Sequence, residues 1–550
     1  MNRLGKDRDP FDTIALSVDF LLKNKLLTTE KWINNSFGLY SVNLQIAGTG
    51  FSVNGKGVSK VAALASAHGE LQERLLNKAF FRINSTLYYE KGQTESFVSK
   101  ETIIDSLRIV FPKMTDLEKV YDLILRCSNG HQPLCDIFVG VNGKEFILPS
   151  IATDIIYGTN GMCAGNTKEE SIIQGVSEIV ERFVSRVLFE ERISVPSFDY
   201  KELDNCRYIE SIISKLKSFG IEVLIKDLSL GFNLPAIGVV FYNIKTLQFF
   251  FKIGVHPNLN LAIERCFTEF AQGKTDEGVL ELVDYVSWFC TNENRLQKYF
   301  KDGHAAVPID LLIDSGQGDL ENKLFNTNKE NLDYMFSIIK DMGYDVYFID
   351  NSNEVFEAYR IVIPGMSEIL TADEFESQLL DFYRANNVSK ALKKEPLSLE
   401  DIESVKDIIA KEGKLLEELS LKYPSINIKR DGRSVPCFKW YELINLEYLR
   451  IGEVKKSFEF LVSLHEEIKK NPYYLCLLTL ESFVVEKKIE KKDYQRFKDQ
   501  TECFFSGFVL DWAFSLLNAP DEVYSISFDK NDNHFYRQQS RLYDIATKKW

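Results

Sequence analysis

The sequence predicts a mixed α/β body followed by an all-α C-terminal domain, and two patterns along the chain support this fold class. Up to about residue 370, short β-rich runs alternate with amphipathic helical runs, which is typical of sheets covered by helices. After residue 370 the runs are helical and are separated by prolines. We therefore expect two domains, residues 1–372 and 373–550, which suits a length of 550 residues.

The elements of the body follow from the period of their apolar residues. Short β-rich runs predict strands at residues 40–46, 221–226, 236–242, 247–253, 345–349 and 359–363. Longer amphipathic runs predict helices at residues 59–81, 168–188, 259–272 and 329–342. Residues 303–328 have weak periodicity and several turn residues, so we expect a long loop or insertion there.

The C-terminal third contains a series of helical patterns, at residues 397–423, 440–449, 454–470, 473–487 and 492–517. Their lengths and short connections suggest TPR-like helical hairpins, although no 34-residue signature repeats. Such an array usually presents a surface to a protein partner. The alternative is a helical cap that stabilises the body or a dimer.

Charge and cysteine usage limit the class of protein. A formal net charge of −14 disfavours a generally basic nucleic-acid or anionic-membrane binder. No run of about 18 apolar residues predicts a membrane span, and the polar start of the chain predicts no signal peptide. Nine cysteines scattered at long intervals fit reduced thiols. We expect a cytoplasmic protein that binds neither nucleic acid nor membrane.

The motif Glu-x-x-Glu-Arg occurs twice, and both copies lie on predicted helices. Residues at i, i+3 and i+4 share one face of a helix, so each motif places its charged side chains together. A third predicted helix has a related face. The three faces carry Ser66, Glu70, Glu73 and Arg74, then Glu178, Glu181 and Arg182, then Arg265, Glu269 and Gln272.

Two interpretations of these faces are open. In the first interpretation, the charged side chains form ordinary i, i+4 ion pairs on helix faces that are exposed to solvent. However, residues 61–67 are small and apolar nearly all round, so the first helix is expected to pack on several sides. Inward-facing carboxylates repel one another unless they bind cations, and Mg²⁺ prefers such oxygen ligands together with phosphates, which arginine grips bidentately. We therefore favour a metal–nucleotide site.

Two glycine-rich loops precede the acidic helices. The first, residues 50–57, comes within one residue of a phosphate-binding P-loop, but Gly57 stands where that motif needs a Ser or Thr hydroxyl for Mg²⁺. The second, residues 159–167, leads into the second acidic helix, where Thr167 is a candidate N-cap and backbone amides could meet an anion. A plain turn with a cap is the alternative for this second loop.

Taken in chain order, these residues resemble the motifs of the YcaO family. The resemblance rests on Ser66-Ala67-x-Gly69-Glu70-x-x-Glu73-Arg74, on Asn160-Gly161-x-x-Ala164-Gly165-Asn166-Thr167 with Glu178-x-x-Glu181-Arg182, and on Arg265-x-x-x-Glu269-x-x-Gln272. It extends to Asn54-Gly55-Lys56-Gly57, His256-Pro257 and Ile363-Pro364-Gly365-Met366-Ser367, so it covers roughly residues 1–370. Gly5-Lys6-Asp7 and the helical C-terminal third are most similar to the stand-alone enterobacterial members.

The resemblance implies a YcaO-type α+β fold and an ATP site without a P-loop. In the family, ATP phosphorylates the oxygen of a peptide backbone amide, which makes the amide carbon electrophilic. Motif matching assigns Glu70, Glu73, Glu178, Glu181 and Glu269 to Mg²⁺. It assigns Lys6, Thr13, Ser66, Arg74, Asn160, Arg182, Arg265 and Gln272 to the nucleotide, and it assigns no catalytic residue.

The resemblance also implies partners. The stand-alone members are regarded as accessory factors in β-methylthiolation of a small-subunit ribosomal protein, so we expect a peptide or protein substrate, with a ribosomal protein as a candidate. A homodimer is the default oligomer. One alternative is a non-catalytic ATP-binding scaffold that recruits partners through its helical domain. Another is a peptide-modifying cyclodehydratase or thioamidation enzyme. Azoline formation is disfavoured because no proline-rich tail follows Pro520.

Overall fold

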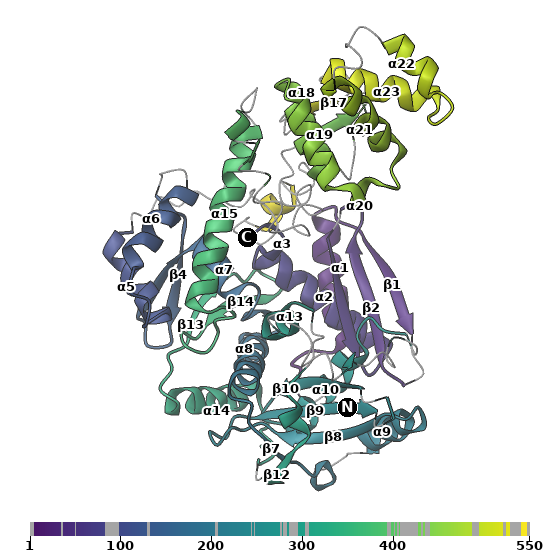
Figure 1. Ribbon diagram of the computed structural model, residues 1–550. Coiled ribbons are helices and arrows are strands. Elements are labelled where there is room, and N and C mark those ends of the chain that lie inside the picture. Colours follow the sequence, from purple (N-terminus) through teal and green to yellow (C-terminus); the bar gives the residue numbers. More distant parts are fainter. Residues whose placement is uncertain are drawn as a thin grey trace. The chain divides into compact units, whose positions relative to one another are not determined.

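Figure 1 shows the computed structural model of the chain, which forms two compact units. The first unit contains residues 1–83, 89–376 and 541–550, and the second contains residues 84–88 and 377–540. The structure describes residues 5–34, 37–49, 51–82, 98–128, 132–203, 207–243, 245–246, 248–275, 278, 283–284, 295–302, 307–318, 320–392, 398–400, 402–403, 406, 427–430, 433–434, 440–486, 494–520, 524–527 and 541–546. The predicted fold class, a mixed α/β body with a helical C-terminal region, is confirmed.

The N-terminal part of the first unit is a three-stranded antiparallel sheet with a helix packed on it. The elements are α1 (Pro10–Lys23), β1 (Thr28–Asn34), β2 (Tyr40–Ile46), β3 (Ser52–Gly57), α2 (Lys60–Leu76) and α3 (Ala79–Arg82). Strand β3 lies so close to α2 that a Cβ atom on Gly55 would stand 2.1 Å from the carbonyl oxygen of Ala63. Glycine is therefore required there. Ser59 caps α2 by accepting a hydrogen bond from the Ala62 amide (3.2 Å).

The second layer is a six-stranded sheet in the order β11-β10-β9-β8-β7-β12, covered on both faces. Its strands are β7 (Val195–Ser197), β8 (Glu222–Asp227), β9 (Ala236–Asn243), β10 (Gln248–Val255), β11 (Val283–Asp284) and β12 (Asp314–Gln317). Apolar side chains of α9 (Arg207–Ser218) and α10 (Leu259–Ala271) pack on one face. Those of α8 (Lys168–Glu191) and α14 (Asn328–Asp341) form a second core on the other face. Short 3₁₀ turns, Tyr200–Glu202 and Ile309–Leu312, and the helix α13 (Arg295–Asp302) complete this part.

A five-stranded sheet in the order β5-β4-β13-β14-β6 forms the third layer. Its strands are β4 (Cys135–Gly140), β5 (Glu145–Pro149), β6 (Met162–Gly165), β13 (Tyr347–Asp350) and β14 (Glu357–Val362), with α5 (Lys100–Val110), α6 (Leu117–Cys127) and α7 (Ser150–Tyr157) nearby in the chain. Helix α8 joins this sheet to the previous one, because its buried residues share a core with β14. The helix begins at the N-cap Thr167, which confirms the predicted cap, and ends at Arg192 in the left-handed conformation.

The second unit is mainly helical. It contains α18 (Trp440–Arg450), α19 (Val454–Ser463), α20 (His465–Ile468), α21 (Pro472–Val485), α22 (Tyr494–Thr501) and α23 (Gly507–Asn518) around one apolar core. The all-α prediction is wrong in one respect, because β15 (Asn427–Arg430), β16 (Arg433–Ser434) and β17 (Tyr524–Ser527) form a small sheet. The TPR-like architecture stays a prediction. The boundary between the units falls inside α15 (Ala372–Leu392), and the predicted domain division at residue 372 likewise stays a prediction.

The predicted strands and helices of the body exist, with two local differences in the body and further ones in the second unit. The expected helix at 59–81 is interrupted, because Lys78 adopts φ +60° between α2 and α3. The expected loop at 303–328 contains β12, which pairs in parallel with β7, while residues 303–306 and 319 lie outside the described residues. In the second unit, the predicted helix at 454–470 is split into α19 and α20, and the one at 492–517 is split into α22 and α23. Most of the pattern at 397–423 lies outside the described residues.

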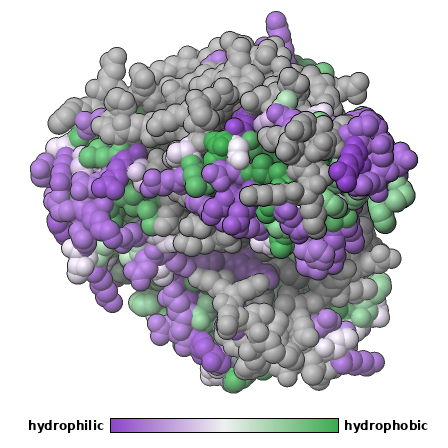
Figure 2. All heavy atoms as spheres, turned by 45° about the horizontal axis from the view of Figure 1, so that its top comes forward, coloured by the Kyte–Doolittle hydropathy of each residue, from purple (hydrophilic) through white to green (hydrophobic). Residues whose placement is uncertain are grey.

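The coloured part of the surface drawn in Figure 2 is mainly hydrophilic, with apolar side chains in small groups. Within the described ranges, no helix has both the length and the apolar character that crossing a membrane requires.

Candidate nucleotide and metal site

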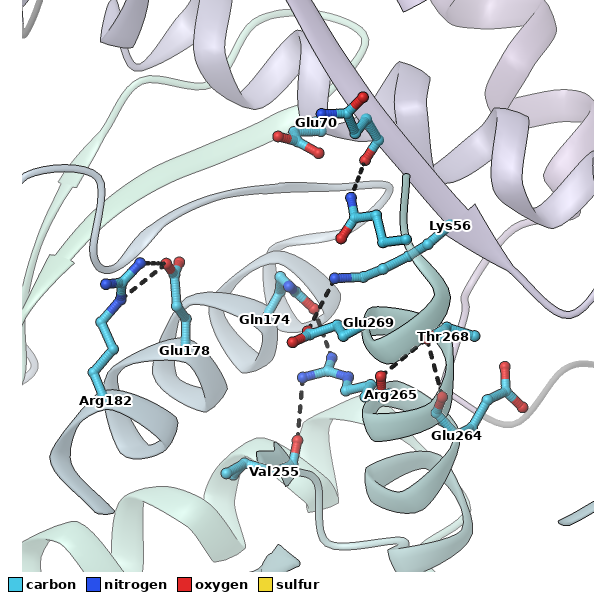
Figure 3. Close-up of polar contacts among 12 residues, drawn as sticks. Lys56, Glu70, Gln174, Glu178, Arg182, Val255, Glu264, Arg265, Thr268 and Glu269 are labelled. Atoms are coloured by element: carbon cyan, nitrogen blue, oxygen red, sulfur yellow. Dashed lines mark hydrogen bonds and ion pairs between the residues drawn. The ribbon is translucent and has the colours of Figure 1, made fainter. Parts of the chain in front are cut away.

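The first unit contains a cavity of about 1010 Å³ between α2, α8 and α10, and residues of β3, β10 and the N-terminal segment also line it. Twelve of the residues predicted for the site line it: Lys6, Thr13, Ser66, Glu70, Glu73, Arg74, Glu178, Glu181, Arg182, Arg265, Glu269 and Gln272. Figure 3 shows carboxylates from the three helices around one space. The structure therefore brings together side chains that are far apart in the sequence.

Asn160 is the predicted site residue that does not line this cavity. Its side chain is buried, and its Nδ2 donates a hydrogen bond to the carbonyl oxygen of Ser367 (2.7 Å). Asn160 therefore lies apart from the other predicted residues, and its contact with the nucleotide stays a prediction. Asn160 instead ties the turn before β6 to the segment after β14, which carries the Pro-Gly-Met-Ser motif.

Helix α2 contributes two carboxylates and an arginine that pairs with both of them. Arg74 pairs with Glu70 (Nη2 to Oε1, 3.6 Å) and with Glu73 (Nη1 to Oε1, 3.4 Å). Burial nevertheless raises the pKa of the Glu73 carboxyl to about 8, and it raises the pKa of Glu70 as well. The neighbouring Glu178 adds to both shifts, because like charges disfavour ionisation.

Helix α8 repeats this arrangement from the other side of the cavity. Arg182 Nη2 lies 2.9 Å from Glu178 Oε1, one helical turn away on the same face (Figure 3). Burial raises the pKa of the Glu181 carboxyl to about 8, and the proximity of Glu269 contributes further. Strongly shifted carboxyl groups gathered in one cavity are typical of a functional site.

Helix α10 contributes Glu269, whose partner comes from β3. Lys56 Nζ lies 2.9 Å from Glu269 Oε1. Burial acts to raise the pKa of Glu269, but Lys56 and Lys252 outweigh it, so the pKa falls below its ordinary value. Arg265 is held in place by two contacts, to Gln174 Oε1 (2.6 Å) and to the Val255 carbonyl oxygen (3.1 Å). Its guanidinium is therefore oriented before any ligand arrives.

The N-terminal segment is fastened to the start of α8 by a residue that sequence reasoning missed. The carboxylate of Glu170, only 5% exposed, accepts hydrogen bonds from Lys6 Nζ (3.0 Å), from the Asp7 amide (3.0 Å) and from Asn166 Nδ2 (3.1 Å). Thr13 Oγ1 donates to Asn166 Oδ1 (2.9 Å). The spacing of Thr167 and Glu170 fits a capping box, a signal that could have drawn attention to Glu170. The segment thus covers one side of the cavity.

His256 also lines the cavity and is neutral. Burial lowers its pKa to about 3, and the nearby Arg265 and Lys6 add to the shift. The Asn258 amide donates to His256 Nδ1 (3.0 Å), so the ring proton lies on Nε2. The imidazole can therefore donate a hydrogen bond to an anion but carries no charge.

The oxygen donors of the cavity fit a hard cation that is also coordinated by a phosphate. Carboxylate oxygens from three helices line the cavity, and Mg²⁺ prefers such oxygens. Among the residues that the structure describes, no group of three His, Cys, Asp or Glu side chains converges closely enough to hold a metal ion. Mg²⁺ usually binds through one or two carboxylates plus substrate phosphates, so the arrangement suits a metal that arrives with a nucleotide.

The chain belongs to the YcaO family. The family model described as YcaO cyclodehydratase, ATP- and Mg²⁺-binding, matches residues 54–367, which include the three acidic helices. ATP and Mg²⁺ are thus the cofactors of its family.

The chain is similar to two bacterial proteins over most of its length. It is 28% identical over 487 residues to an uncharacterised protein of Haemophilus influenzae, covering 83% of this chain and 81% of that protein. It is also 28% identical over 404 residues to the ribosomal protein S12 methylthiotransferase accessory factor YcaO of Escherichia coli, covering 70% of this chain and 68% of that protein.

Two solved structures are similar at lower identity. One is a heterocyclase in complex with substrate and cofactor (15% identity, 66% of this chain, 52% of that chain, TM-score 0.46). The other is YcaO from Methanopyrus kandleri bound with AMPPCP and Mg²⁺ (15% identity, 67% of this chain, 94% of that chain, TM-score 0.42).

Proposed function

We propose that this chain binds ATP with Mg²⁺ in the cavity between α2, α8 and α10 and transfers the terminal phosphoryl group to a backbone amide oxygen of a peptide or protein. The observation that carries the proposal is the set of carboxylates from three helices, interleaved with arginine and lysine, around one cavity. Glu70, Glu73, Glu178, Glu181 and Glu269 are the candidate Mg²⁺ ligands. Bound Mg²⁺ would supply neutralisation of phosphate charge.

The basic residues of the cavity would bind and orient the nucleotide. Arg74, Arg182 and Arg265 present guanidinium groups that match phosphate oxygens, and Lys6 adds an ammonium from the N-terminal segment. Gln174 and the Val255 carbonyl fix Arg265 in advance. Phosphoryl transfer depends on positioning and electrostatic stabilisation, and these side chains supply both.

The test compares two variants of α8. Glu178→Ala removes a cavity carboxylate, whereas Glu191→Ala removes an exposed one at the far end of the same helix. Mg²⁺ and ATP at about 100 times the dissociation constant should stabilise the wild type and Glu191→Ala by about 2.7 kcal/mol against thermal unfolding. Glu178→Ala should lose that stabilisation together with ATP hydrolysis. Full retention in Glu178→Ala would contradict the proposed site.

A second candidate function is an accessory role in methylthiolation of a ribosomal protein, which is the role named for the Escherichia coli relative. The second unit favours it, because Phe504 (79% exposed) and Phe508 (66% exposed) leave aromatic surface free for a partner. An accessory protein would bind ATP with little turnover even with its partner present, so steady-state ATP hydrolysis in the presence of ribosomal protein S12 separates the two functions. The homodimer also stays a prediction, which analytical ultracentrifugation would test.

A further inference from the structure

Lys56 lines the cavity, and the carboxylate with which it forms an ion pair lies on a different secondary-structure element. Lys56 belongs to β3, its side chain is 28% exposed, and its Nζ lies 2.9 Å from Oε1 of Glu269 on α10 (Figure 3). Arg74 and Arg182 differ in this respect, because each pairs with a glutamate of its own helix. The contact between Lys56 and Glu269 therefore depends on how β3 is placed against α10.

The backbone around Lys56 is held from two sides. On one side, a Cβ atom on Gly55 would stand 2.1 Å from the Ala63 carbonyl oxygen, so β3 lies directly on α2. On the other side, Gln272 Nε2 donates to the Asn54 carbonyl oxygen (2.7 Å). Because the main chain is fixed by both helices, a change of partner by Lys56 requires only rotation of its flexible side chain.

The ammonium group lies where a metal ligand is expected. Glu269 is a candidate Mg²⁺ ligand, and Glu70 and Glu181 are close enough to attract Lys56 as well. A divalent cation on Glu269 would meet a positive charge 2.9 Å from the same oxygen atom, and like charges at that distance repel strongly. Lys56 and the metal therefore compete for this carboxylate.

We propose that Lys56 is the resident counter-ion of Glu269, that a divalent cation displaces it, and that its ammonium then pairs with a phosphate oxygen of the nucleotide. The inference rests on the proposed function for its second partner. A displaced lysine in a partly buried cavity needs a new anion. The metal adds positive charge beside Glu70 and Glu181, which weakens their attraction for Lys56, whereas a nucleotide brings an additional anion. Metal and nucleotide consequently assist each other's binding, and the coupling is reciprocal.

Manganese titration followed by electron paramagnetic resonance tests this exchange without relying on activity. The variants are Lys56→Gln, Lys56→Arg and, as a matched control, Lys60→Gln at the exposed start of α2. Without nucleotide, Lys56→Gln should bind Mn²⁺ about tenfold more tightly than the wild type, since one positive charge beside a partly exposed carboxylate is removed. Lys56→Arg and Lys60→Gln should behave as the wild type.

With AMPPCP present, the wild type should bind Mn²⁺ at least tenfold more tightly than without it, and Lys56→Gln should lose most of that gain. Unchanged or weaker Mn²⁺ binding by Lys56→Gln without nucleotide would overturn the inference, because a purely structural lysine gives that result. A failure of AMPPCP to bind the wild type would instead overturn the proposed function, while the titration without nucleotide would still decide whether Lys56 competes with the metal.

Discussion

Glu170 anchors the N-terminal segment, and Glu170→Gln is the change that tests this anchor. Glutamine keeps the size of the side chain and one acceptor oxygen but removes the charge. The wild-type carboxylate accepts from Lys6 Nζ, the Asp7 amide and Asn166 Nδ2, all within 3.0–3.1 Å. The variant loses its attraction for Lys6 and turns one acceptor position into a donor that faces other donors.

The size of the effect follows from these contacts. The ion pair to Lys6 contributes at most about 1 kcal/mol, because the lysine side chain is 53% exposed and therefore screened by water. The hydrogen bonds from the Asp7 amide and Asn166 reach a buried carboxylate, and such charge-assisted bonds contribute about 1.5–3 kcal/mol each. Since glutamine retains part of this, we expect a net loss of about 2 kcal/mol in the free energy that holds the segment, which corresponds to roughly 30-fold.

Two assays report on the anchor, with Glu169→Gln as the control that makes the same charge change at the next residue. Hydrogen exchange of the peptide covering residues 5–13 should be faster in Glu170→Gln. The dissociation constant for AMPPCP with Mg²⁺ should rise by up to about 30-fold, because Lys6 is no longer held at the cavity. Equal exchange rates and equal affinities in the two variants would refute the idea that Glu170 positions this segment.

Other predictions concern stability. Arg360→Ala should lower the free energy of unfolding in urea by about 3–5 kcal/mol, because it removes one partner of a buried ion pair, the guanidinium 2.8 Å from Asp154. A loss below about 1 kcal/mol would contradict this. Gly55→Ala should lower the melting temperature, because the added Cβ would overlap the backbone of α2. Gly69→Ala should raise the melting temperature, because a Cβ there has no atom within 4 Å and alanine stabilises a helix by about 1 kcal/mol relative to glycine. Equal shifts in melting temperature would be incompatible with the packing described. Burial raises the pKa of Glu481 from 4.5 to about 8, so the folded chain keeps a proton that the unfolded chain has already released. Stability should therefore fall as the pH rises from 5 to 8. Urea titrations should show that Glu481→Gln makes this slope smaller without abolishing it, because Glu73 and Glu181, whose pKa values are also raised to about 8, contribute the rest. An unchanged slope would argue against a protonated Glu481.

The helices that carry the site could be predicted from the sequence because their signals are local. The two Glu-x-x-Glu-Arg motifs and the Arg265 face each lie within one amphipathic run, and periodicity places such side chains on one face. The cap at Thr167 is equally local. Motif spacing therefore predicted which side chains share a helix face, although it could not give the distances between the three faces.

Contacts between distant segments could not be predicted in this way. Glu170 meets Lys6 across 164 residues, and Lys56 meets Glu269 across 213 residues. The hydrogen bond from Asn160 to the carbonyl oxygen of Ser367 spans 207 residues, and no local pattern reveals it. Short strands such as β12 were missed for a related reason, since four residues give no measurable period and their pairing with β7 is set by tertiary structure.

The central claim is that the carboxylates of α2, α8 and α10 hold a metal together with a nucleotide. Crystals grown with AMPPCP and Mn²⁺ test this most directly, because anomalous scattering locates manganese independently of the protein model. We predict manganese between the phosphates and carboxylates drawn from Glu70, Glu73, Glu178, Glu181 and Glu269, with the nucleotide in the same cavity. Nucleotide or manganese bound at another place on the chain, with this cavity empty, would contradict the account.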